Sequence, residues 1–313
     1  MSAEHPKGGV DYPRTFLEFR DWFPNEDSCV EFLEHLRWPG GFVCPQCDGR
    51  SGWRIGQRRM WMCASCGRKT SVTAGTIFHR SHTPLSTWFA AAWFVTSTKN
   101  GTSALALQHQ LGFGSYETAW AWLHKPRRVM VRPDRDLLSG VVELDETFIG
   151  GVSVGKDGAG SDKLPVRIAV ERVSPTKLGR VRFEVADAPG SLGLVAFGFH
   201  VIEPGSTVRT DGARMLRRFA DHGYVHEATT VYNSPDKSKE LPGVHMVASL
   251  LKRWLTGTLH YRASDKHLPY YLDEYAFRFN RRHSSARGML FYRLLQQAVA
   301  TDPHPLTELI AAS

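Results

Sequence analysis

The chain has 313 residues, a hydrophobic fraction of 42% and a formal net charge of +8 at pH 7, with a pI near 9.3. This apolar content excludes a largely disordered protein, and the length predicts more than one folded domain. The positive charge favours a polyanionic partner, although charge alone does not separate nucleic acid from an anionic membrane surface. No signal peptide precedes the first predicted element, and the longest strongly apolar run, residues 88–95, is too short to cross a bilayer. We therefore expect an intracellular protein.

Residues 1–38 form the first predicted segment, which contains one short helix. Asn25 precedes this helix, and Glu26 and Asp27 suit its first turn because acidic side chains favour a helix N-terminus. Cys29 lies on its apolar face and is expected to pack as a small hydrophobic residue.

The next segment, residues 39–75, carries two Cys-x-x-Cys pairs separated by fifteen residues. The four cysteines are Cys44, Cys47, Cys63 and Cys66. This spacing is typical of a zinc ribbon, and four thiolates around one Zn²⁺ leave no open position for chemistry. The alternative is two disulfides or free thiols. The surrounding arginines and lysine form either a solvated basic surface or a DNA contact.

Residues 76–133 predict three helices. They span residues 85–97, 103–111 and 116–125. Thr102 can cap the second helix and Ser115 the third. Two short helices joined by a glycine-containing turn fit a helix-turn-helix, with a basic end at Lys125, Arg127 and Arg128. Many helical connectors share this pattern, so a role in DNA binding and a purely structural role both stay open.

The strand predicted at residues 141–151 alternates between apolar and polar side chains. Glu143 and Asp145 therefore share one face of it. Burying two carboxylates beside a core is costly unless something compensates, and a bound metal ion is the usual compensation. The alternative is an edge strand whose second face is in water.

The elements that follow predict a mixed sheet within residues 134–295. The glycine-rich stretch 150–163 lacks the ending of a phosphate-binding loop and is interpreted as a flexible connection. Further strands are predicted at residues 166–173, 180–186, 207–210 and 227–232, and helices at 191–199, 213–222 and 244–255. Counted from the first strand, the order β-β-β-α-β-α-β-α is that of a ribonuclease H-like sheet with helices on both faces.

Three positions beyond the first strand carry candidate chemistry. Asp211 closes a strand and precedes a helix, where a capping role alone would explain it. On the helix at 244–255, His245 and Lys252 lie seven residues apart and project the same way, beside an apolar face. Such a helix can supply a metal-facing group and a phosphate-binding cation, or it is simply a solvated amphipathic helix.

Together these motifs resemble those of the DDE transposase and retroviral-type integrase superfamily, and most of all bacterial transposases of the insertion-sequence 1595 family. The resemblance spans roughly residues 15–295 and rests on the cysteine pairs, ELDETFIGG, RTDG, VHMVASLLKRWLTGTLH and HLPYYLDEYAFRFNRRHSSARG. It implies a multidomain protein of mixed α+β and α/β class. Its parts would be a small zinc ribbon, a helical, helix-turn-helix-like segment, and a ribonuclease H-like mixed-sheet catalytic core with C-terminal helices. Residues 296–313 would be a C-terminal tail.

The resemblance implies a catalytic site made of Asp145, Asp211 and His245, with Lys252 as the cation that follows. In the superfamily two aspartates and a glutamate hold two divalent ions, Mg²⁺ or Mn²⁺. His245 stands where the glutamate is expected, and imidazole suits Mn²⁺ better than Mg²⁺. His245 could instead orient water or hold a DNA phosphate. Glu240 and Glu227 are the alternative carboxylates, and Glu146 is a less favoured alternative to Asp145, because alternation turns it to the apolar face.

The implied activity is DNA transposition by two-metal phosphoryl transfer, in which cleavage at a transposon end frees a 3′ hydroxyl that attacks target DNA. The implied partner is double-stranded DNA, bound by a homodimer or larger assembly in the bacterial cytoplasm, at the nucleoid. The expected DNA-contacting residues are Lys125, Arg127, Arg128, Arg253, Arg281 and Arg282. Two alternatives stay open: a catalytically inactive zinc-ribbon and helix-turn-helix DNA-binding regulator, and a structure-specific nuclease that never joins ends.

Overall fold

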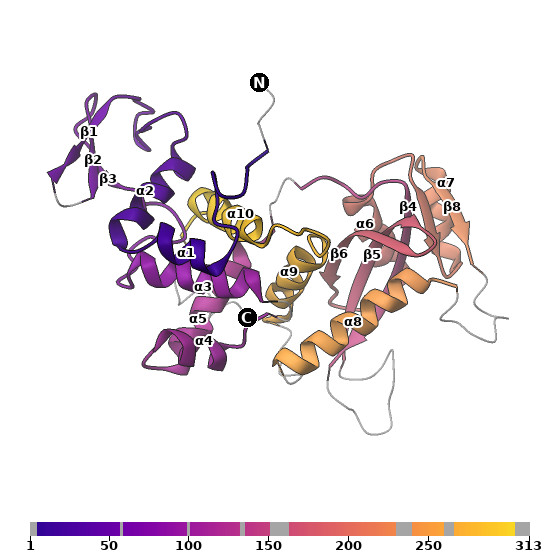
Figure 1. Cartoon of the computed structure of the whole chain (residues 1–313). Helices are drawn as coiled ribbons and strands as arrows, with labels where there is room; N and C mark the ends of the chain where they lie inside the picture. Colours follow the sequence, from indigo (N-terminus) through magenta and orange to yellow (C-terminus); the bar gives the residue numbers. More distant parts are fainter. Residues whose placement is uncertain are drawn as a thin grey trace. The chain divides into compact units, whose positions relative to one another are not determined.

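The computed structural model describes residues 5–56, 59–98, 101–131, 135–150, 163–229, 240–259 and 266–303. The chain divides into two compact units, one formed by Met1–Arg132 with Ser284–Ser313 and the other by Pro133–His283 (Figure 1). Most of the predicted glycine-rich connection, the end of the strand predicted at 227–232 and most of the predicted C-terminal tail lie outside the described residues.

The first unit is built from helices that share an aromatic core. They are α1 (Phe16–Trp22), α2 (Glu26–Arg37), α3 (Leu85–Ser97), α4 (Ala104–Leu111), α5 (Tyr116–Arg128) and α10 (Arg287–Ala300). Phe291 of α10 packs edge-on against Phe19 and Phe89, with ring centroids 5.4 and 5.7 Å apart. The predicted catalytic domain extends to residue 295, whereas these contacts place α10 in the first unit.

Side-chain caps fix where several of these helices begin. Asn25 accepts the backbone N–H of Ser28 at the start of α2, and Ser115 caps α5 as predicted. The predicted cap of α4 is wrong by one residue, because Ser103 and not Thr102 accepts the N–H of Ala106. Helix α5 also runs past its predicted end, since the buried Pro126 and Arg127 keep the last turn packed despite the missing proline N–H.

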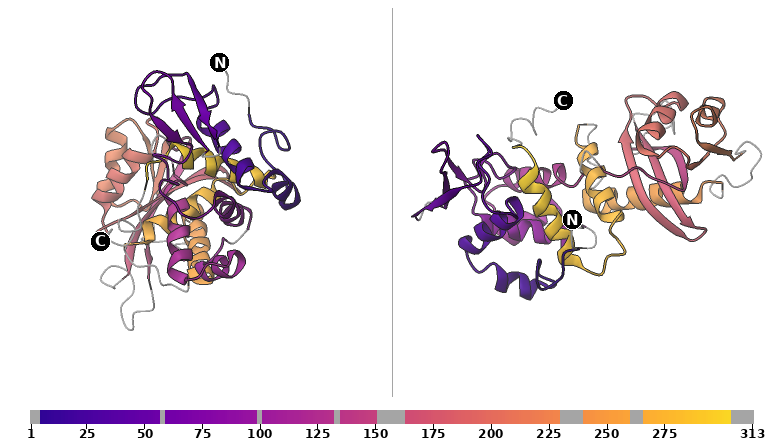
Figure 2. Two further views of the ribbon diagram at one scale, coloured as in Figure 1. Left: turned by 90° about the vertical axis from the view of Figure 1, so that its left-hand side faces the viewer. Right: turned by 90° about the horizontal axis from the view of Figure 1, so that it is seen from above.

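A small antiparallel sheet in the first unit carries the cysteine pairs. Within the described residues it has three strands in the order β1 (Gly52–Ile55), β2 (Met60–Cys63) and β3 (Lys69–Ser71). The ring of Trp61 stacks on Phe42, with centroids 5.2 Å apart and an interplanar angle of 6°. Figure 2 shows this sheet at the edge of its unit.

The second unit contains a mixed sheet of five strands within the described residues, in the order β6-β5-β4-β7-β8. The strands are β4 (Val141–Ile149), β5 (Leu164–Ser174), β6 (Lys177–Val185), β7 (Thr207–Thr210) and β8 (Val225–Ala228). β4, β5 and β6 pair antiparallel, whereas β7 pairs parallel with both β4 and β8. β4 therefore lies at the centre of the sheet.

Helices cover both faces of this sheet (Figure 1). α8 (Pro242–Leu259) and α9 (Leu268–Phe279) share a core with Ile149 and Ile168 on one face. On the other face, α6 (Ser191–Val201), the 3₁₀ turn η2 (Arg214–Arg217) and α7 (Arg218–Asp221) pack with Leu144. The helix predicted at 213–222 is thus a 3₁₀ turn followed by one short α-helix. Alternation along β4 directs its odd-numbered side chains toward α8.

Candidate functional site

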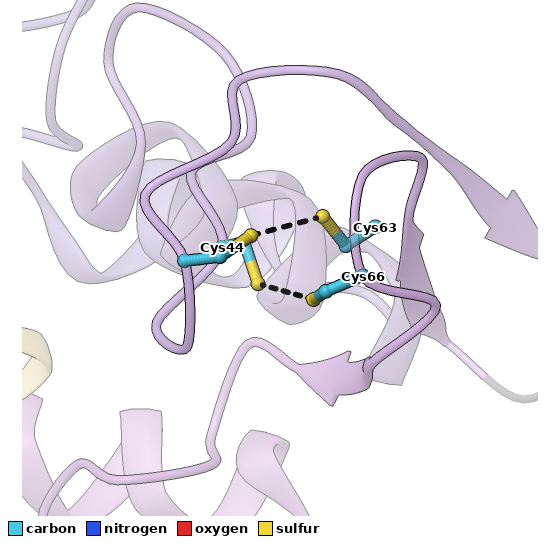
Figure 3. Close-up of side chains that lie close together, drawn as sticks. Cys44, Cys63 and Cys66 are labelled. Atoms are coloured by element: carbon cyan, nitrogen blue, oxygen red, sulfur yellow. Dashed lines mark hydrogen bonds between the residues drawn. The ribbon is translucent and has the colours of Figure 1, made fainter.

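The four paired cysteines lie together in the small sheet of the first unit. Their Sγ atoms are all within 4.8 Å of one another, and no other group of three or more candidate ligand side chains in the described part of the chain meets that limit. The Sγ atoms of Cys44 and Cys66 are 3.7 Å apart, and those of Cys47 and Cys63 are 3.6 Å apart (Figure 3). Both separations far exceed a disulfide bond of about 2.05 Å, so the thiols are arranged for a metal ion.

Local backbone turns create this arrangement. The N–H of Asp48 donates to the carbonyl of Cys44 at 2.9 Å, and the N–H of Gly67 donates to that of Cys63 at 3.0 Å. Asp48 and Gly67 both adopt left-handed backbone conformations, with φ of 56° and 69°, which allow each tight turn to close. The backbone N–H of Cys66 lowers the pKa of the Cys63 thiol to about 6 and so favours the thiolate that binds zinc.

The second unit brings the predicted catalytic residues to one place. Asp145 lies in the middle of β4, and Asp211 directly follows β7, the parallel neighbour of β4. His245 lies in the first turn of α8. Burial raises the pKa of the Asp145 carboxyl to about 6; the Asp211 carboxylate adds to the rise, and His245 opposes it. The side chains of Asp211 and His245 therefore lie near enough to Asp145 for their charges to act on its carboxyl.

The three side chains differ in exposure and in their existing contacts. Asp145 is half-buried, and its Oδ1 accepts the N–H of Glu146 at 2.7 Å. Asp211 is exposed, and its Oδ1 accepts the N–H of Ala213 at 3.1 Å; it does not cap the following 3₁₀ turn, whose N-cap is Ala213. His245 is half-buried. Their ligand atoms do not all fall within the 4.8 Å limit that the cysteines meet.

Lys252 lies further along the same helix as His245. Its side chain is half-buried, and burial lowers its pKa, with a further lowering from the charge of Lys163. Lys163 immediately precedes β5, the strand that pairs with β4. The charge of Lys163 thus adds to the positive potential at Lys252.

Two of the three alternative carboxylates form ion pairs with arginines. Glu146 faces the opposite side of β4, where its carboxylate pairs with Arg167 at 3.1 Å and accepts the N–H of Gly190. Glu227 forms an ion pair with Arg209 at 2.6 Å. Glu240 lies in the turn that precedes α8.

Two family models match the chain, and together they cover more than half of it. The transposase zinc-ribbon domain matches residues 24–69, and the ISXO2-like transposase domain matches residues 137–280. The chain belongs to the transposases of the insertion-sequence 1595 family. The four cysteines fall within the first match and form its structural zinc site, and Asp145, Asp211, His245 and Lys252 all fall within the second. No curated protein matches the chain.

Membership of this family makes DNA the partner of the chain. None of the helices in the described part has the length and apolar character needed to cross a membrane.

The basic end of α5, predicted to contact DNA, has three side chains with different surroundings. Arg127 is only 1% exposed and belongs to the interior of the first unit. The Lys125 ammonium lies 5.6 Å from the centre of the Trp88 ring, and burial lowers its pKa. Arg128 is exposed. Of these three predicted DNA contacts, Arg128 is the one placed for an external ligand.

The other predicted DNA contacts, Arg253, Arg281 and Arg282, also differ in whether they face solvent or bind within the protein. Arg282 donates to the carbonyls of Gly179 and Phe279, at 3.1 and 2.8 Å, and also to that of Leu178. Its guanidinium lies 3.9 Å from the centre of the Phe279 ring. These contacts give Arg282 a part in joining α9 to β6. Arg281 likewise lies over the ring of Phe277 and donates to its carbonyl at 3.2 Å.

Arg253 is exposed on α8, in the same helix as His245 and Lys252. The aromatic residues interleaved with this basic group, by contrast, are core residues. The buried ones are Tyr270, Tyr271, Tyr275, Phe277 and Phe279.

Proposed function

We propose that the chain is an active DNA transposase that cuts at transposon ends and transfers the freed 3′ hydroxyl to target DNA. The observation that carries this proposal is that Asp211, which follows the strand beside β4, and His245, in the first turn of α8, both act on the charge of Asp145. The element order β4-β5-β6-α6-β7-α7-β8-α8 supports a ribonuclease H-like core, because it is the order expected for that fold.

The charge balance along β4 supports a cation at Asp145. Glu143 pairs with Arg172 and Glu146 pairs with Arg167. Among the described residues Asp145 has no lysine or arginine partner, although it lies between these two carboxylates on the same strand. A half-buried carboxylate without a positive partner is unfavourable, and a divalent cation would compensate it.

Asp145, Asp211 and His245 are the residues that would hold this cation. Two carboxylates and an imidazole form a donor set that suits Mn²⁺ at least as well as Mg²⁺. When bound, divalent ions stabilise the negative charge that develops on the attacking and leaving oxygens of a phosphodiester.

The chain's own cations would position the DNA. Lys163 adds to the positive potential at Lys252, which lies seven residues after His245 on α8, and we assign Lys252 to a phosphate of the reacting strand. Arg253 and Arg128 are exposed and are assigned to the DNA backbone outside the site. Bringing two transposon ends together requires at least two copies of the chain, and the DNA substrates place it at the bacterial nucleoid.

The test is an assay that separates cutting from joining. The wild-type protein is incubated with DNA that carries the element's own flanking repeats and with a target plasmid, first in Mg²⁺ and then in Mn²⁺. Cleavage followed by covalent joining supports the transposase. Binding without cleavage in either metal would favour the inactive regulator, and cleavage of branched DNA without joining would favour the nuclease.

A further inference from the structure

Glu143 is a carboxylate at the centre of the sheet that the site described above does not use. Its side chain lies on β4, and the residue is 1% exposed. Oε2 accepts the backbone N–H of Val244 at 3.0 Å, although 101 residues separate the two. Oε1 lies 3.2 Å from Nε of Arg172, which is on the neighbouring strand β5. Both carboxylate oxygens are therefore engaged within the second unit.

The contact with Val244 joins β4 to the first turn of α8. The first N–H groups of a helix have no partner within the helix, and a carboxylate that accepts one of them is also favoured by the positive end of the helix dipole. Arg172 balances the remaining charge, so the buried carboxylate is both hydrogen-bonded and paired.

Gly243 permits this close approach. A Cβ atom at residue 243 would lie 2.7 Å from Oε2 of Glu143 and 3.0 Å from Cδ2 of Leu178. Any larger residue would displace the carboxylate or the helix. Gly257 on the same helix faces open space, so close packing is a property of the first turn and not of every glycine in α8.

The contact between Glu143 and Val244 also bears on the positions of the candidate catalytic residues. Asp145 follows Glu143 by two residues on the same face of β4, and His245 directly follows Val244. The contact between Glu143 and Val244 thus links the strand that carries Asp145 to the turn that carries His245. We propose that Glu143 is a positioning residue that holds the first turn of α8 on β4 and so sets the place of His245 relative to Asp145. This inference rests on the proposed function of that site.

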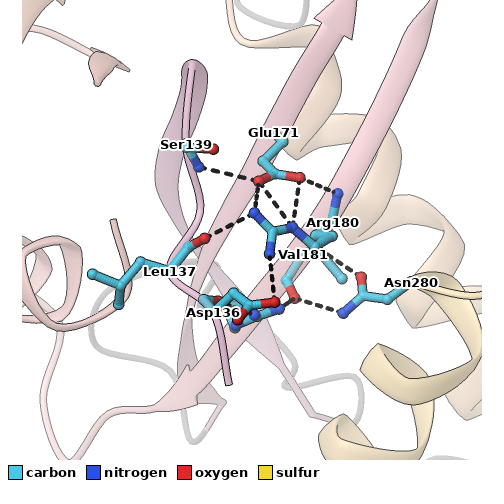
Figure 4. A network of polar contacts seen from close by, with 8 residues as sticks. Asp136, Leu137, Ser139, Glu171, Arg180, Val181 and Asn280 are labelled. Atoms are coloured by element: carbon cyan, nitrogen blue, oxygen red, sulfur yellow. Dashed lines mark hydrogen bonds and ion pairs between the residues drawn. The ribbon is translucent and has the colours of Figure 1, made fainter. Parts of the chain in front are cut away.

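Glu171 provides a matched control. It lies on β5, is 8% exposed, and accepts backbone N–H groups from Ser139 and Arg180 while pairing with the Arg180 guanidinium (Figure 4). Like Glu143, Glu171 is a buried carboxylate that pairs with an arginine and accepts backbone N–H groups. Its described hydrogen bonds and ion pairs do not include α8.

The test compares Glu143→Gln with Glu171→Gln, and Gly243→Ala with Gly257→Ala, in the full-length protein. Amide hydrogen exchange follows the first turn of α8, and calorimetry follows Mn²⁺ binding. Glu143→Gln and Gly243→Ala are each expected to speed exchange at Val244 by about tenfold, as loss of a charged hydrogen bond implies. Both should weaken Mn²⁺ binding at least about tenfold, which is typical of losing a group that orients a metal ligand.

The two controls should change either quantity by less than about threefold, the ordinary scatter of surface or remote substitutions. The proposal is overturned if Glu143→Gln and Gly243→Ala leave exchange at Val244 unchanged, or if Glu171→Gln weakens Mn²⁺ binding equally. If the wild-type protein binds no Mn²⁺, the proposed metal site fails, and exchange at Val244 still decides whether Glu143 holds the turn. Gly243→Ala keeps the test informative if Glu143→Gln does not fold, because it perturbs the same contact without removing the charge of Glu143.

Discussion

Asp145 and Asp211 lie close enough for one carboxylate to oppose ionisation of the other. Burial is the larger cause and raises the pKa of the Asp145 carboxyl to about 6, and Asp211 raises it further. Two strands that are adjacent and parallel bring these residues together from positions 66 apart in the sequence. The apoprotein therefore holds unfavourable charge at this site, which a cation would relieve.

Replacing Asp145 by asparagine should stabilise the apoprotein while abolishing strand transfer. A pKa of about 6 in the folded state and 3.8 in the unfolded state corresponds to a loss of up to about 3 kcal/mol from the wild-type free energy of unfolding at pH 7. Because the folded-state pKa is the higher one, the loss is absent below about pH 4, grows as the pH rises and is complete above about pH 6.

The measurement is denaturant unfolding of wild-type protein and Asp145→Asn in chelator at pH 7.5 and pH 4. The variant should be more stable at pH 7.5 and equal to wild type near pH 4. A variant that is less stable than wild type at pH 7.5 would contradict the account of Asp145.

Binding of Mn²⁺ should weaken as the pH falls through about 6. The metal must displace the Asp145 proton, so protons compete with the ion once the pH is below the raised pKa of that carboxyl. Calorimetry between pH 5 and pH 8 should show the apparent affinity rising with pH and levelling above about pH 7. The Asp145→Asn variant, which cannot release this proton, serves as the control. An affinity that does not change between pH 5 and pH 7 would refute the prediction.

Arg282 and Arg253 should respond differently to replacement by alanine. Arg282 donates to three backbone carbonyls, so its loss should lower the free energy of unfolding by about 2 kcal/mol. Arg253 is exposed; its loss should leave stability unchanged and lower the salt dependence of DNA binding by about one phosphate contact. Thermal unfolding and DNA binding at several salt concentrations measure both. The assignment of a structural role to Arg282 and a DNA-contacting role to Arg253 would be contradicted if both substitutions changed DNA affinity equally and Arg282→Ala did not lower stability.

Removal of zinc should unfold the small sheet of the first unit. The cysteine cluster holds both tight turns together, and structural zinc supplies much of the folding free energy of such small domains. Cys63→Ser should lose bound zinc and change the fluorescence of Trp61, which stacks on Phe42. Cys29→Ala is the control, because Cys29 is buried in α2 away from the cluster. Full zinc content in Cys63→Ser, measured by elemental analysis, would show that this ligand assignment is wrong.

The parts of the fold that local patterns determine were predictable from the sequence. Alternation along β4 correctly placed Glu143 and Asp145 on one face. Spacing alone identified the cysteine cluster, and Ser115 caps its helix as predicted. In each case the signal lies in a few neighbouring residues, and local geometry is sufficient to interpret it.

What depends on tertiary packing was not predictable in the same way. Arg127 and Arg282 were predicted to contact DNA because they are basic. In the structure Arg127 is buried, and Arg282 donates hydrogen bonds to backbone carbonyls. The role of Glu143 depends on Val244, 101 residues away, and no pattern along the chain connects them. Helix α10 follows α9 closely in sequence but packs with the N-terminal helices, because its aromatic face fits their core.

The most direct test of the catalytic site is strand transfer by Asp145→Ala, Asp211→Ala and His245→Ala, compared with wild type in Mg²⁺ and Mn²⁺. DNA binding by each variant is measured in parallel. We expect all three to bind DNA like the wild type and to lose strand transfer by at least about a thousandfold, the scale on which essential transition-state groups act. Strand transfer that persists in Asp145→Ala or Asp211→Ala would show that the carboxylates beside β4 and β7 are not the catalytic ones.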